Sequence, residues 1–116
     1  MTEFQGRPAH TGRVAILVSR YHERVTTPLL DGARQACREA GVPDDAIDLL
    51  WLPGAFELGV AAAAVLEDAR VACVIALGCV VRGETPHFDY VAGETSRILA
   101  GLAAEHAVPV GFGLLT

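Results

Sequence analysis

The sequence contains no lysine, and its nine basic residues are all arginine. It therefore offers no lysine for Schiff-base chemistry or for a phosphate-binding GxxxxGK[ST] loop. The formal net charge of −5 argues against a protein that reads nucleic-acid phosphates through a basic face. Aromatic residues make up only 6% of the 116 residues, whereas hydrophobic residues make up 52%. This length and apolar content predict one globular domain and exclude a disordered chain.

Cysteine and serine are also scarce. Cys37, Cys73 and Cys79 are too widely spaced for a disulfide framework and form no CxxC pair, so we interpret them as small core residues. The sequence has two serines and neither a GxSxG nor an HExxH motif, which argues against an acyl-transfer triad. Residues 1–12 lack the apolar segment of a signal peptide, and no uncharged stretch approaches the ~20 residues that span a bilayer. We therefore expect a soluble, cytoplasmic protein without a metal site.

Short apolar runs alternate with helical patterns after an N-terminal arm, residues 1–12. The first helix is expected to start at Thr27-Pro28, a capping hydroxyl followed by a residue suited to the first turn, and to stop at Gly41. Helical spacing predicts two more helices, over residues 55–69 and 88–103. Strands are predicted at residues 14–19, 47–52, 71–81 and 108–115. The order βαβαβαβ predicts one α/β domain over residues 13–116, with a four-stranded parallel sheet and helices on both faces.

Chemistry is expected beyond the carboxyl ends of these strands, where ligands bind in parallel sheets. The loop after the third strand, expected over residues 82–89, carries His87, our best candidate for a general acid or base. An exposed loop histidine without a function is about as good an interpretation of His87 as a general acid or base. Tyr21 follows the first strand, where it could stack on a planar ring. Residues 78–85, which lead into the loop with His87, come close to a phosphate-loop motif. However, Glu84 stands in the lysine position and would repel a triphosphate.

The fourth predicted strand has no helix after it. A strand buried on both faces needs a second covering layer, because three or four uncovered side chains would forfeit about 1.5–3 kcal/mol each. Either the chain continues beyond Thr116 or a partner covers this surface, and we expect the former.

The loops together resemble the 6,7-dimethyl-8-ribityllumazine synthase family. The resemblance extends from Arg13 to Thr116 and depends most on PGAFE at residues 53–57 and on RGxTxHxDYV at residues 82–91. It implies a flavodoxin-like, three-layer α/β/α fold. It also implies an enzyme of riboflavin biosynthesis that condenses 5-amino-6-(D-ribitylamino)uracil with 3,4-dihydroxy-2-butanone 4-phosphate and needs no cofactor.

The resemblance also implies roles for individual residues. Tyr21 would stack on the pyrimidine, and His87 would transfer protons. The ribityl chain would lie along Ala55, Phe56 and Glu57, and the pyrimidine would meet the backbone of Cys79, Val80 and Val81. Glu84 and Thr85 would offer backbone N–H groups to the phosphate. Phe112 would reach the pocket of a neighbouring subunit, because family sites lie between the subunits of a pentamer that often builds an icosahedral shell.

The sequence departs from the family pattern in places. His22 stands where Asn is usual, and Tyr21 where Phe or Trp is common. The arginine and lysine that family members carry near the phosphate, after the fourth strand, are not in this sequence, so we expect weaker phosphate binding. The alternative is a non-catalytic flavodoxin-like module that binds a pyrimidine or flavin or forms a shell.

Overall fold

The computed structural model describes residues 1–7 and 12–116. The elements follow in the order β1 (Arg13–Ser19), α1 (Glu23–Glu39), η1 (Asp44–Ala46), β2 (Ile47–Leu52), η2 (Ala55–Glu57), α2 (Leu58–Val65), β3 (Val71–Cys79), α3 (His87–His106) and β4 (Val110–Leu115). The predicted arm, residues 1–12, falls partly outside the described residues, and residues 1–7 are exposed and carry no helix or strand. No helix in the described part of the chain is long and apolar enough to cross a membrane.

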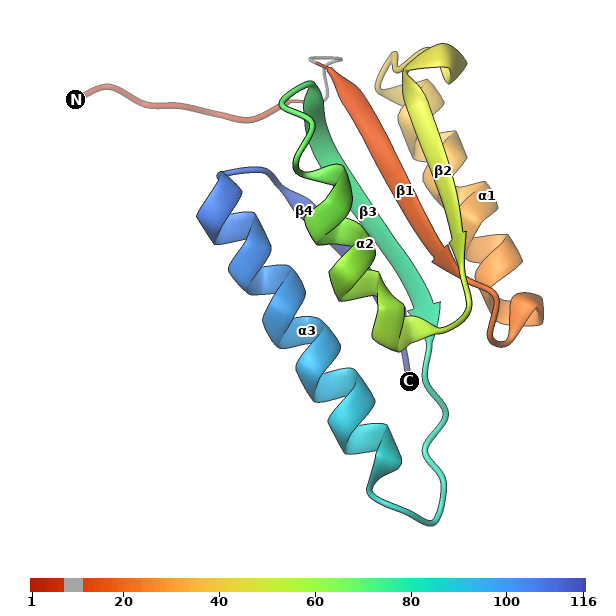
Figure 1. Cartoon of the computed structure of the whole chain (residues 1–116). Helices are drawn as coiled ribbons and strands as arrows, with labels where there is room; N and C mark the ends of the chain where they lie inside the picture. The colour runs from red at the N-terminus through yellow and green to blue at the C-terminus, as the bar shows by residue number, and fades with distance from the viewer. Residues whose placement is uncertain (8–11) are drawn as a thin grey trace.

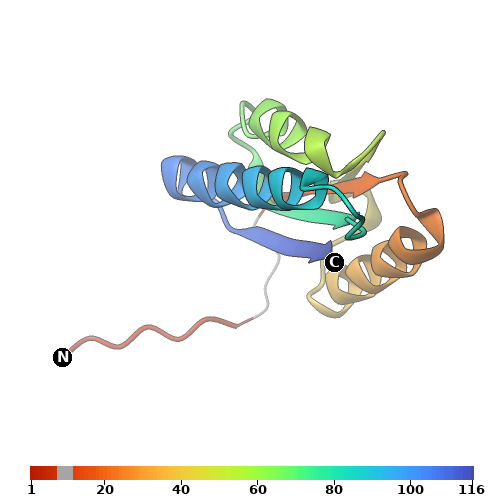
Figure 2. The same ribbon diagram turned by 90° about the horizontal axis from the view of Figure 1, so that it is seen from below.

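The four strands form one all-parallel sheet in the order β2-β1-β3-β4. This order matches the start of the flavodoxin-like arrangement. Helices α2 and α3 cover one face and α1 covers the other, which makes three layers (Figures 1 and 2). The predicted α/β/α fold with a four-stranded parallel sheet is therefore confirmed.

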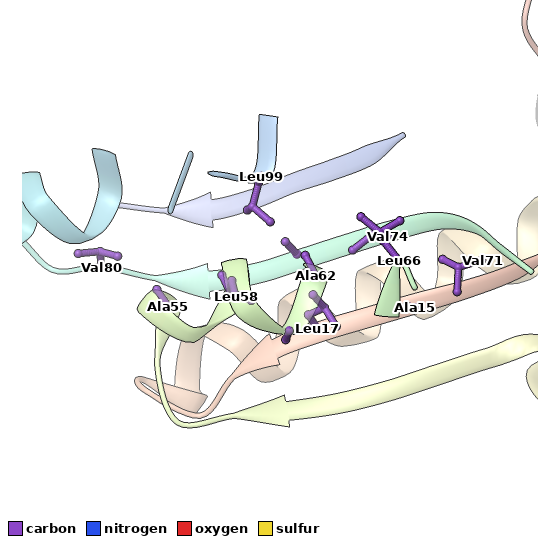
Figure 3. Close-up of a cluster of buried hydrophobic side chains, with 12 residues drawn as sticks. Ala15, Leu17, Ala55, Leu58, Ala62, Leu66, Val71, Val74, Val80 and Leu99 are labelled. Carbon is purple, nitrogen blue, oxygen red and sulfur yellow. The ribbon is translucent and has the colours of Figure 1, made fainter. Parts of the chain in front are cut away.

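The central strand β1 is buried on both faces because its side chains alternate between two cores. Ala15 and Leu17 point towards α2 and α3, where they join Leu58, Ala62 and other apolar residues (Figure 3). Ile16 and Val18 point the other way, towards α1. All four are fully buried, and each large apolar side chain buried in this way contributes about 1.5–3 kcal/mol. The two cores fix the strand ends and with them the loops that follow.

The predicted start of the first helix at Thr27-Pro28 is wrong. Helix α1 begins at Glu23, and Pro28 lies inside it. The carbonyl of His22 accepts hydrogen bonds from the N–H groups of Val25 and Thr26 at 2.8 and 3.0 Å, so the first turn forms well before the proline. The β1–α1 loop is consequently short, and Tyr21 and His22 are held between a strand end and a helix start.

The second helix is shorter than predicted. Helix α2 ends at Val65, and the chain turns at Asp68, whose carboxylate accepts a hydrogen bond from the N–H of Arg70 at 2.9 Å. An aspartate that bonds its own backbone two residues on favours a turn over a helix. The predicted extension to residue 69 is therefore wrong.

The fourth strand is covered by helices on one face. Val110 and Leu114 pack against the α2/α3 core, so alternation turns Gly111, Gly113 and Leu115 to the other face. Leu115 is 46% exposed. Phe112 is 53% exposed, and glycine has no side chain to bury, so β4 exposes two large side chains rather than three or four.

Candidate functional site

The loops after β1, β2 and β3 meet at the carboxyl end of the sheet, at the lower end of the molecule in Figure 1. Between them lies a cavity of about 570 Å³. Its walls are mainly apolar, with a few polar groups, as is typical of small-molecule sites. The lining residues are Tyr21, Pro53, Gly54, Ala55, Phe56, Glu57, Cys79, Val80, Val81, His87, Tyr90 and Val91.

Most of the residues singled out from the sequence line this one cavity. Tyr21 follows β1, and Ala55, Phe56 and Glu57 form η2 after β2. Cys79, Val80 and Val81 lie at the end of β3 and just after it, and His87 begins α3. Glu84 and Thr85 are not among the lining residues and lie exposed in the loop before α3. Phe112 lies elsewhere, beside a smaller hollow of about 270 Å³ between α3 and β4.

Tyr21 is carried on a sharp bend at the end of β1. The next residue, His22, has left-handed backbone angles, with φ 59° and ψ 59°. Asn, Asp and His adopt this region more readily than other side chains, so His22 suits the bend as the family's usual Asn does. The N–H of Tyr21 donates to Ser19 Oγ at 3.2 Å. The rings of Tyr21 and His22 pack edge to face, with 4.2 Å between their centroids. These contacts hold Tyr21 at the cavity.

The second wall is built by η2, which follows Pro53-Gly54. The carbonyl of Ala55 accepts hydrogen bonds from the N–H of Leu58 and from Thr95 Oγ1, the latter at 3.3 Å and buried. Thr95 belongs to α3, so this bond joins the PGAFE segment to the helix that carries His87. Sequence reasoning missed Thr95, because no spacing rule connects it with a residue forty positions away.

The sequence had suggested that His87 lies in the loop, but it is the first residue of α3. Its N–H donates to Thr85 Oγ1 at 3.4 Å, and the N–H groups of Asp89 and Tyr90 donate to the carbonyl of Pro86. Tyr90 and Val91 lie three and four residues further on, on the same helical face, and they also line the cavity. That spacing is the signal that could have added them to the predicted site.

The cavity is open to the surroundings on its aromatic side. Tyr21, Phe56 and Tyr90 are 54%, 61% and 68% exposed. Apolar side chains that gather around an open pocket mark a surface for a ligand or a partner. In the described residues, no group of three His, Cys, Asp or Glu side chains could hold a metal ion. The arrangement offers a planar stacking surface, a carboxylate and an imidazole around one volume.

The comparisons with known proteins agree with this geometry. The family model of 6,7-dimethyl-8-ribityllumazine synthase matches residues 11–116. A 6,7-dimethyl-8-ribityllumazine synthase from Gemmatimonas aurantiaca is 49% identical over 117 residues, which cover 100% of this chain and 71% of the relative. The chain therefore belongs to the 6,7-dimethyl-8-ribityllumazine synthase family, and its activity is that of a lumazine synthase in riboflavin biosynthesis.

Proposed function

We propose that the cavity binds 5-amino-6-(D-ribitylamino)uracil, with the pyrimidine on Tyr21 and the ribityl chain along Ala55, Phe56 and Glu57. The observation that carries this proposal is that Tyr21, Glu57 and His87 line the same cavity. An aromatic ring favours a flat heterocycle, and a carboxylate accepts hydrogen bonds from ribityl hydroxyls. The backbone at Cys79, Val80 and Val81 would meet the polar edge of the pyrimidine.

The second substrate, 3,4-dihydroxy-2-butanone 4-phosphate, would place its phosphate at the backbone N–H groups of Glu84 and Thr85. These residues precede α3, a helix of 20 residues. The dipole of a helix favours negative charge at its N-terminal end, which supports an anion there. The carbon skeleton would then lie beside His87.

The reaction forms two new bonds between the substrates. The free amine of the pyrimidine attacks the ketone and water leaves, which gives an imine. Phosphate is eliminated, and the ribityl-bearing nitrogen closes the second ring with loss of another water. The reacting amine belongs to the substrate, so no enzyme lysine and no cofactor is needed. His87 would accept and return protons during these steps.

Orientation would supply more of the acceleration than His87. Holding two reactants in place lowers a barrier by roughly 7–11 kcal/mol, whereas one acid–base group contributes about 10²–10⁴-fold, or about 3–5 kcal/mol. His87→Ala should therefore slow lumazine formation by about that factor without abolishing it. The measurement is single-turnover absorbance with both substrates. A rate no higher than the uncatalysed condensation would refute this ranking.

The complete site would lie between subunits of a pentamer, with Phe112 closing the pocket of its neighbour. Phe112 is 53% exposed and lies outside the cavity of its own chain, and the aromatic wall of that cavity is open.

We also place the protein in the cytoplasm, where its cysteines, all unpaired, would stay reduced.

Mixing two impaired variants tests the shared site. Phe112→Ala and His87→Ala should each lower activity. In co-expressed subunits, an intact site forms wherever a Phe112→Ala pocket meets the Phe112 of a His87→Ala neighbour. Activity of the mixture should therefore exceed that of either variant alone. Activity equal to the average of the two would contradict a shared site.

A further inference from the structure

Arg82 lies in the loop between β3 and α3 and contacts the first turn of α3 at two places. Its guanidinium carbon is 4.3 Å from the centroid of the Phe88 ring, and its Nη2 is 3.8 Å from Asp89 Oδ1. Phe88 and Asp89 directly follow His87 in the sequence. One side chain therefore holds the two residues next to the proposed proton-transfer group.

The loop has few other connections to α3. Residues 81–87 are all exposed, and a Cβ built on Gly83 would meet nothing within 4 Å. In the described part of the chain, the hydrogen bonds between the loop and the helix come from Thr85 and Pro86, which lie immediately before it. Arg82 precedes Gly83, and its ion pair with Asp89 connects this earlier part of the loop to the helix.

Phe88 gives the contact a fixed end. Its ring is partly buried and packs against the α2/α3 core. A guanidinium can lie flat on an aromatic ring and donate from its edge to a carboxylate at the same time, whereas an ammonium cannot make both contacts in this way. Arg82 is thus suited to connect the loop to a core-anchored ring.

We propose that Arg82 is a positioning residue that sets the direction of the His87 imidazole through Phe88 and Asp89. The proposal rests on the proposed role of His87. Arg82 and Asp89 are 69% and 66% exposed, and contacts at exposed sites are individually weak. The expected effect is a reduced rate rather than a loss of activity.

The test compares Arg82→Ala, Arg82→Gln and Arg82→Lys in the wild-type chain and in a His87→Ala chain. With His87 present, Arg82→Ala and Arg82→Gln should lower kcat by about 3–10-fold and leave the KM of the pyrimidine substrate unchanged. Arg82→Lys should recover part of kcat, because it keeps the charge but not the stacking. In the His87→Ala chain, the same substitutions should have no further effect on kcat. Arg97→Ala is the matched control, because Arg97 pairs with Glu94 on the same helix, at 2.7 Å and away from the loop.

Each remaining outcome decides the matter. Wild-type kcat in Arg82→Ala would overturn the proposal, and so would an equal loss of kcat in both backgrounds. In either case, a slow His87→Ala enzyme would leave the proposed function standing. A raised KM for the phosphate substrate in both backgrounds would overturn it in favour of direct phosphate binding. Wild-type kcat in His87→Ala itself would overturn the role of His87 and this inference together.

Discussion

Thr95 and Thr26 are 2% and 0% exposed, yet their hydroxyls have different surroundings. Thr95 Oγ1 donates to the carbonyl of Ala55 in the cavity wall, whereas Thr26 Oγ1 has no hydrogen-bond partner among the described residues. A buried polar group without a partner costs about 1–3 kcal/mol, and a hydrogen bond contributes about 1 kcal/mol net. The same substitution should therefore have opposite effects at the two positions.

Thr95→Val should lower the free energy of unfolding by about 1 kcal/mol, and Thr26→Val should raise it by a similar amount. Valine keeps the shape and removes only the hydroxyl. Denaturant unfolding of both variants and of Thr95→Ser, which keeps the hydroxyl, measures the difference. Equal shifts of the same sign in both valine variants would contradict the hydrogen-bond argument.

Individual site residues were predictable where topology alone brings them together. Tyr21 and His87 follow different strands, and the rule that parallel strand ends share one edge is enough to place both at the cavity. Thr95 was not predictable, because its partner is fixed by how two helices pack. The roles of all the site residues remain predictions, and Glu84, Thr85 and Phe112 lie outside the cavity wall.

The helix pair α2/α3 packs closely because Gly59 carries no side chain. A Cβ at Gly59 would come within 2.9 Å of Ile98 Cγ2, and Ile98 is β-branched with few alternative rotamers. Gly59→Ala should therefore destabilise the protein by about 1–3 kcal/mol through overpacking, which exceeds the roughly 1 kcal/mol gained in helix propensity.

Gly101→Ala is the matched control for this prediction. Gly101 lies in α3 with nothing within 4 Å of a built Cβ, so this substitution should raise stability by about 0.5–1 kcal/mol. Thermal unfolding of the two variants should shift in opposite directions. A stabilised Gly59→Ala protein would show that the two helices separate freely.

The sequence predicted which elements exist better than where they end. Hydrophobic runs located all four strands, and the signal is strongest for β1, which is buried on two faces. Pro28 misplaced the start of α1, because the His22 carbonyl begins the helix earlier than propensity indicates. Asp68 ended α2 early through a side-chain bond that apolar periodicity does not register.

Two acidic residues link the whole fold to pH. Hydrogen bonds from Arg13 hold the pKa of Asp48 below its usual value, and the Arg70 side chain lowers the pKa of Asp68 to about 2. A carboxyl group with a depressed folded-state pKa stabilises the protein above its unfolded pKa of about 4. That stabilisation is lost as the pH falls through the folded pKa.

Thermal unfolding temperatures should therefore decline between about pH 4 and pH 2 partly because of these two groups. The double variant Asp48→Asn/Asp68→Asn should start from a lower unfolding temperature at pH 7 and decline less steeply in that range. Calorimetry of both proteins from pH 7 to pH 2 makes the comparison. Parallel curves would show that the two ion pairs do not contribute.

The bond from Thr95 to Ala55 and the close contact of Gly59 with Ile98 have a common consequence for the evolution of this enzyme. The bond joins the helix that carries His87 to the segment that forms the opposite wall of the cavity, and the close contact joins the same helix to α2, which directly follows that segment. A mutation that loosens this pair would widen the cavity and weaken the core in one step. Selection for thermal stability and selection for turnover should therefore favour the same residues at these positions. We expect no trade-off between stability and catalytic rate there.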